Sequence, residues 1–117
     1  MSQFFLIGEK DLWNPASGVS RVFIRVADAL SADIGVPSGV GPMLADEAQV
    51  DLPVFQVFVD SLVSRFYRDS NHPIQRSMTE GFIATALVLL DRAGGTLPEG
   101  VEPLLELSRE HSGYMVV

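Results

Sequence analysis

The chain has 117 residues, no cysteine and a formal net charge of −7. This length suits one domain, expected over residues 1–117, and the lack of cysteine excludes disulfides, thiolate nucleophiles and cysteine-bound metal centres. The eight basic residues are spread along the chain, which argues against nucleic-acid binding. The longest apolar stretch, residues 81–90, is too short to cross a bilayer, and the apolar run at 4–7 is too short for a secretory signal. We therefore expect a cytoplasmic protein with no membrane or nucleic-acid partner.

Hydrophobic content is high for so small and acidic a chain. Apolar residues make up 47% of the sequence and the mean hydropathy is +0.25. A small monomer has limited interior in which to bury them, so the excess favours a subunit interface or a lined cavity. We expect a homo-oligomer, most simply a two-fold dimer.

The N-terminal half predicts a strand and a helix. Residues 3–8 are short and rich in Phe, Leu and Ile, which is typical of a strand. Asn14-Pro15 or Ser17 begins a helix that ends near Ile34, where Gly35 suits the C-terminal cap. We expect its apolar stripe to face the core: Val19, Val22, Phe23, Val26, Ala27, Leu30 and Ile34. Residues 46–50 form a weaker candidate strand that could pair with the first.

The C-terminal half predicts three further helices. Asp51 caps the second, and Asn71 and Pro73 begin the third, which runs to about Ala93. The third helix is apolar around most of its girth and should be buried on several sides, with Gly81 and Ala84 allowing close approach of a neighbouring helix. A short fourth helix over 103–111 precedes an apolar tail, 113–117, which should pack on the domain, a partner or the sheet edge.

Together these elements predict a mainly α domain with a minor β component. We expect four helices and a small two-stranded antiparallel sheet formed by residues near 3–8 and 46–50. The dimer is expected to form through the second or third helix.

The sequence contains no complete catalytic or metal-binding motif. The two histidines stand 39 positions apart, and the glycine-rich turns lack the Lys and Ser/Thr of a phosphate loop, so we expect no metal and no cofactor. If the protein is an enzyme, Asp46, Glu47 and His72 are the candidate acid–base groups. His72, Arg76 and Glu80 share one helix face, which suits anion binding or proton transfer, or an ordinary Arg76–Glu80 surface ion pair.

The single tryptophan, Trp13, lies beside Asn14 in a predicted loop. It either fills the core or forms the wall of a pocket. A pocket that binds a small apolar molecule would be lined by aromatic residues, Phe23 among them, and by the polar residues Asn14 and Arg76. The candidate ligand-binding residues are Trp13, Asn14, Phe58, Phe66, Arg76 and Phe82.

Two strings are distinctive: Leu12-Trp-Asn-Pro-Ala-Ser-Gly-Val-Ser-Arg21, and Gly35-Val-Pro-Ser-Gly-Val-Gly-Pro-Met43 followed by Asp46-Glu47. With the Phe-rich second helix and Glu80-Gly-Phe, they resemble a family of small actinobacterial proteins of unknown function. The resemblance covers residues up to about 93 and implies no activity. It marks positions worth testing: Trp13, Asn14, Arg21, Pro37, Gly41, Asp46 and Glu47.

Three functions are consistent with these features. The leading hypothesis is a non-enzymatic interaction module that acts as a homodimer or with a protein partner. The second is a binder of a small apolar metabolite, or a cofactor-free cyclase or isomerase, with an aromatic pocket. The third, which rests on the charge of −7, is an acidic immunity- or antitoxin-like inhibitor of a basic enzyme.

Overall fold

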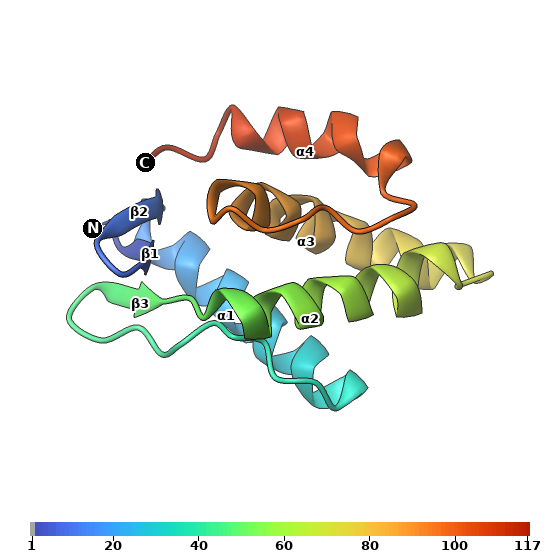
Figure 1. Ribbon diagram of the computed structural model, residues 1–117, viewed down its shortest axis with the longest axis horizontal. Helices are drawn as coiled ribbons and strands as arrows, with labels where there is room; N and C mark the ends of the chain where they lie inside the picture. The colour runs from blue at the N-terminus through green and yellow to red at the C-terminus, as the bar shows by residue number, and fades with distance from the viewer. Residues whose placement is uncertain (1) are drawn as a thin grey trace.

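The computed structural model describes residues 2–117 and confirms a mainly α fold with a minor sheet. Figure 1 shows the sheet at one end of the molecule, α2 and α3 along its length, α4 covering α3, and α1 crossing behind α2. In chain order the elements are β1 Phe4–Ile7, β2 Lys10–Trp13, α1 Ser17–Ile34, β3 Glu47–Gln49, α2 Leu52–Leu62, a π-helical turn η1 Val63–Arg68, α3 Pro73–Arg92, a 3-10 turn η2 Glu102–Leu104, and α4 Leu105–Ser112.

The sheet has three strands, so the expected two-stranded antiparallel sheet is wrong. Its order is β2-β1-β3, and β1 pairs antiparallel with β2 and parallel with β3. Gly8, with φ of 60°, allows a tight turn that returns the chain at once into β2. The chain then passes through α1 before β3, and such a long crossover permits parallel pairing with β1. Lys10 and Asp11 of the edge strand β2 are polar and exposed, so the sequence of β2 does not show the hydrophobic pattern by which a strand is recognised.

Helix α1 has the predicted bounds, but only part of its predicted apolar stripe faces the core. It ends at Ile34, and the N–H of Gly35, with φ of 70°, donates to the carbonyl oxygen of Ser31. Val19 and Val22, expected in the core, are 50% and 58% exposed, whereas Phe23 is buried with its neighbours Ser20 and Ala27. The apolar stripe is wider than the surface that the rest of the fold covers, so one edge of it remains in solvent.

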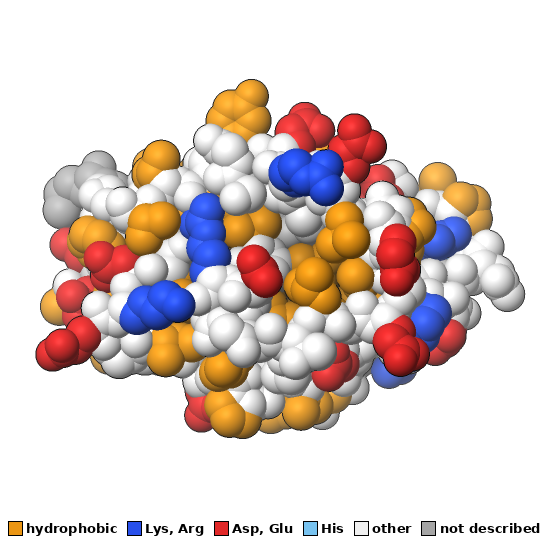
Figure 2. Space-filling view, turned by 45° about the horizontal axis from the view of Figure 1, so that its top comes forward, with side chains coloured by type: hydrophobic (Ala, Val, Ile, Leu, Met, Phe, Trp, Pro, Cys, Tyr) orange, Lys and Arg blue, Asp and Glu red, His pale blue; other side chains and the backbone are white. Residues whose placement is uncertain are grey.

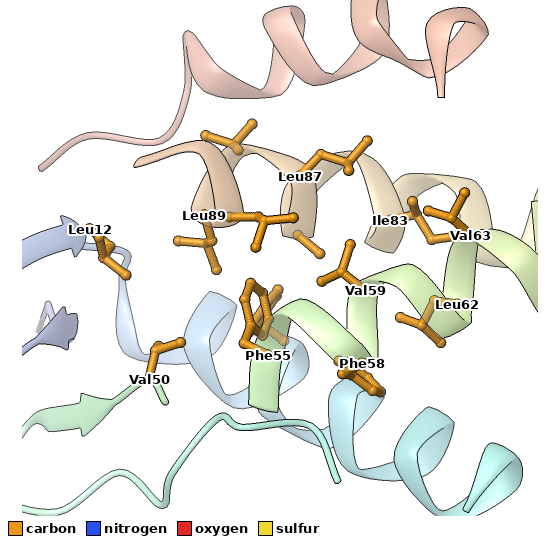
Figure 3. Close-up of a cluster of buried hydrophobic side chains, with 14 of the residues drawn as sticks. Leu12, Val50, Phe55, Phe58, Val59, Leu62, Val63, Ile83, Leu87 and Leu89 are labelled. Carbon is orange, nitrogen blue, oxygen red and sulfur yellow. The ribbon is translucent and has the colours of Figure 1, made fainter. Parts of the chain in front are cut away.

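Helix α2 supplies the centre of the core. The side chain of Asp51 accepts a hydrogen bond from the N–H of Val54 at 3.2 Å, which confirms the predicted cap. Its buried face packs against α3, as Figure 3 shows for the side chains around Phe55 and Val59. The π-helical turn η1 continues this helix, and the adjacent residues Phe66 and Tyr67 are both buried.

Helix α3 is buried on several sides only in its C-terminal half. Its fully or nearly fully buried residues between 83 and 90 are Ile83, Ala84, Ala86, Leu87, Val88, Leu89 and Leu90. In the N-terminal half, Ile74 and Met78 are 59% and 79% exposed. The expected close approach occurs at Ala84, whose carbonyl accepts a hydrogen bond from the Ser108 hydroxyl of α4 at 2.9 Å. It does not occur at Gly81, where an added Cβ would meet nothing within 4 Å.

The C-terminal segment lies against the sheet end of the domain. Met115 is buried, and the N–H of Asn14 donates to the carbonyl of Val116 at 2.8 Å. Arg92 of α3 donates to the carbonyl of Leu12 at 2.9 Å and also contacts Ser112. These bonds join β2, α3 and the end of α4, and so place Trp13 beside α3.

Candidate functional site

An apolar groove, here called the α1–α3 groove, runs between these two helices. Its first section has a volume of about 510 Å³ and its second about 460 Å³, and Met78 lines both. The first section is lined by Trp13, Gly18, Val19, Val22, Phe23, Val26, Met78, Gly81, Phe82 and Thr85. The second is lined by Leu30, Asp33, Phe66, His72, Ile74, Gln75, Met78 and Thr79.

Stacked aromatic rings form the floor of the first section. Trp13 is only 5% exposed, and its ring lies edge-on to Phe23 at a centroid distance of 5.5 Å. Phe23 in turn stacks on Phe82 at 4.9 Å, and Phe82 meets the fully buried Phe58 at 6.4 Å. Because these rings contact one another, they make a rigid floor beneath an open groove and do not surround an enclosed cavity.

The walls of the groove carry its most exposed apolar side chains. Val19 and Val22 come from α1, and Ile74 and Met78 from α3; each is at least half exposed. Sequence reasoning did not place Val19 or Val22 in a site, because it assigned the whole stripe of α1 to the core, and it did not single out Met78 of α3. The sequence did contain a signal for the two valines: the apolar stripe of α1 is wider than one packing contact with the core can cover.

A polar pair borders the groove at Thr85. The Thr85 hydroxyl oxygen lies 2.8 Å from Nδ1 of His111 on α4 and 3.2 Å from the carbonyl oxygen of Gly81. A hydroxyl has one proton to donate, so Thr85 can donate to one of these partners at a time. Sequence spacing did not reveal this pair, because the packing of α4 on α3 creates it.

The three candidate acid–base residues are not brought together. Asp46 and Glu47 are exposed in the turn into β3, where the Asp46 carboxylate accepts a bond from the Gln3 amide at 3.3 Å. His72 is exposed at the start of α3 and lines the second section of the groove. Figure 1 shows β3 and the start of α3 at opposite ends of the molecule. These residues therefore cannot act jointly on one small substrate within a single chain.

The remaining candidate residues are dispersed. The Arg76 guanidinium lies over the Tyr67 ring, 4.5 Å from its centroid, and its buried Nε has no hydrogen-bond partner among residues 2–117. The ion pair foreseen with Glu80 does not form, since within that range the only pair closer than 4 Å is Arg68–Asp69. Phe66 is 5% exposed and lines the second section. Asn14 is half-buried beside Trp13, outside the groove lining.

Similarity to known proteins places the chain in a family but assigns it no activity. Residues 2–117 contain no group of three or more His, Cys, Asp or Glu side chains placed to hold a metal ion. None of the helices in this range combines the length and apolar character needed to cross a membrane. No curated protein and no solved structure matches the sequence. A family model described as a family of unknown function (DUF6086) matches residues 1–117, and the chain therefore belongs to that family.

Proposed function

We propose that this protein is a non-enzymatic interaction module that forms a homodimer through the α1–α3 groove. The observation that supports this most directly is the exposure of Val19, Val22, Ile74 and Met78 along one groove. They are four of the ten large hydrophobic side chains exposed in residues 2–117. Contiguous exposed apolar surface of this kind is typical of a protein–protein interface.

The presence of a glycine at position 81 also supports the groove as the dimer interface. A glycine inside a helix costs roughly 0.5–1 kcal/mol relative to alanine. The fold of the single chain gives no reason for this cost, because Gly81 has no positive φ and an added Cβ would meet nothing within 4 Å. A side chain entering the hollow from a partner would supply the reason.

The charge of the groove helices favours a second copy as the occupant. Helix α1 carries Arg21, Arg25, Asp28 and Asp33, and α3 carries Arg76, Glu80, Asp91 and Arg92, so each helix is formally neutral. The whole excess of −7 therefore lies on other segments. Two such neutral faces can meet without strong repulsion, whereas a basic partner would be attracted to the acidic segments.

The shape of the groove is also complementary to a second copy of itself, because it has both a protruding side chain and a hollow. Met78, at 79% exposure, stands one helical turn from the open hollow at Gly81. In a two-fold interface each patch faces its own copy, so a protruding Met78 can enter the partner's hollow between Gly18 and Gly81. The flexible methionine side chain suits such a contact.

Sedimentation analysis of the wild type and two variants tests this proposal. The wild type is expected to be dimeric at high micromolar concentration, and Met78→Glu to be monomeric there, because an unpaired carboxylate in the contact costs several kcal/mol. Val57→Glu is the matched control, since Val57 is 56% exposed on α2 and lies outside the groove.

Two results would overturn the proposal. One is a wild type that stays monomeric at high concentration; the other is equal weakening of association by Met78→Glu and Val57→Glu. Both variant sites are exposed, so each variant should retain the wild-type circular dichroism spectrum and the comparison stays interpretable.

A small apolar ligand is the second candidate occupant of the groove. The aromatic floor and the volume of about 510 Å³ favour it, since ligand pockets are mostly apolar with a few polar groups such as the Thr85–His111 pair. Native mass spectrometry separates the two proposals: a retained small molecule on a monomer supports the ligand, and a dimer without added mass supports the second copy.

A further inference from the structure

A second hollow, here called the α3–α4 cleft, lies on a different face of the molecule. It has a volume of about 310 Å³ and is lined by Leu87, Val88, Asp91, Arg92, Leu97, Leu105, Ser108, Arg109 and Ser112. Figure 2, with α4 turned toward the reader, shows hydrophobic side chains gathered in a hollow on this face, with charged side chains of both signs around them. None of these residues lines the α1–α3 groove.

The base of the cleft is apolar and belongs to the core. Leu87 and Val88 are 1% and 7% exposed, and Leu97 and Leu105 complete the apolar lining from the loop after α3 and from α4. The Ser108 hydroxyl, also in the lining, already donates to the carbonyl of Ala84. A branched or aromatic hydrocarbon group would therefore be accommodated here without leaving that hydroxyl unpaired.

The rim of the cleft is positive. It carries Arg92, Arg109 and Asp91, a formal charge of one positive unit in a chain whose net charge is −7. Arg92 is held in place by the carbonyl of Leu12 and by Ser112, and neither of these partners neutralises its charge. Arg109 is exposed and forms no ion pair closer than 4 Å with any of residues 2–117.

We propose that the α3–α4 cleft binds a small monocarboxylate with a branched aliphatic or aromatic tail. The tail occupies the leucine-lined base, and the carboxylate accepts charge-assisted hydrogen bonds from Arg109 and from the free N–H groups of Arg92. One negative charge matches the single positive unit of the rim. The small volume selects a short acid over a long fatty chain.

Three probes that share one carbon skeleton test the charge requirement: 4-methylpentanoate, its amide, and 4-methylpentylamine. Titrations followed by NMR should show saturable binding of the carboxylate, with the largest shifts at the methyl groups of Leu87, Leu97 and Leu105. The amide should bind roughly ten- to a hundredfold more weakly, because it loses the charged hydrogen bonds, and the amine more weakly still. Equal binding of amide and carboxylate would overturn the proposal.

Variants locate the site. Arg109→Gln should weaken the carboxylate about tenfold or more while leaving the amide unchanged, and Leu97→Asp should weaken it through repulsion. Arg25→Gln, at an exposed arginine of α1 outside the cleft, is the matched control and should bind as the wild type does. Shifts that map to the α1–α3 groove, or wild-type binding by Arg109→Gln, would contradict the assignment. The dimer test above is independent of this result, since it probes the other face.

Discussion

Ala45 and Asp46 are the non-glycine residues with positive φ in residues 2–117, at 51° and 64°. They form the centre of a two-residue turn whose ends, Leu44 and Glu47, exchange backbone hydrogen bonds at 2.9 and 3.0 Å. Turns with positive φ at both central positions favour Asn-Gly or Asp-Gly, and aspartate tolerates this region better than alanine does. The geometry thus gives Asp46 a structural reason to be present, apart from any acid–base chemistry.

Replacing Ala45 with glycine should stabilise the protein. The left-handed conformation costs alanine about 1–2 kcal/mol, and part of the gain is offset by the greater freedom of glycine in the unfolded chain. We expect Ala45→Gly to raise the free energy of unfolding by about 0.5–1 kcal/mol in urea denaturation. Ala29→Gly, at an exposed position inside α1, should lower it by a similar amount. A destabilised Ala45→Gly variant would contradict the observed turn geometry.

At the scale of elements, Gly39 and Gly81 are glycines for different reasons. Gly39, with φ of 77°, precedes α2, and an added Cβ would lie 2.6 Å from the backbone nitrogen of Phe55 and 2.9 Å from the carbonyl oxygen of Asp51. The packing of the chain itself therefore requires a glycine at position 39. At Gly81 an added Cβ would meet nothing within 4 Å, so the packing of the chain does not require a glycine there, and the proposed dimer contact would supply the requirement.

Alanine substitutions measure this difference. In the Met78→Glu background, where dimerisation does not contribute, Gly81→Ala should raise the free energy of unfolding by about 0.5–1 kcal/mol. Gly39→Ala in the same background should lower it by about 2 kcal/mol or more, because of backbone clash and conformational strain. In the wild-type background, Gly81→Ala should weaken dimerisation by filling the hollow. If it strengthens the dimer instead, the proposed seating of Met78 is wrong.

Across the whole molecule, the acidic excess and the proposed interface lie on different segments. Helices α1 and α3 are neutral, so the charge of −7 is carried by the sheet region, the segment from 35 to 72 and the C-terminal segment from 93. Two copies that associate through the neutral helices still repel one another at longer range through their like net charges.

Salt should therefore strengthen the dimer modestly. Added salt screens the long-range repulsion between the two acidic protomers and removes few attractive ion pairs from an apolar contact. We expect the dissociation constant to fall by a few-fold as the Debye length decreases from about 30 Å to about 10 Å. Sedimentation equilibrium across this range is the measurement. A dimer that weakens steadily with salt would indicate an interface based on ion pairs and would contradict this assignment.

Local signals in the chain predicted the helices well and the sheet poorly. The Asp51 cap, Gly35 after α1 and Pro73 at the start of α3 all mark the observed helix ends. These signals succeed because they depend on backbone groups within one turn. Strand β2 was missed because its residues Lys10 and Asp11 face solvent, and the pairing of β3 was wrong because strand direction depends on where α1 returns the chain.

Of the candidate site residues, Trp13, Phe66, Phe82 and His72 were foreseen and line the α1–α3 groove. Asp46 and Glu47 lie far from His72. Composition and periodicity alone determined a small, acidic, mainly helical protein of high apolar content. Only the tertiary structure decided which apolar residues remain outside, because exposure depends on how far α1 and α3 are covered by their neighbours. It likewise decided the Thr85–His111 contact and the α3–α4 cleft, since both arise where α4 packs on α3.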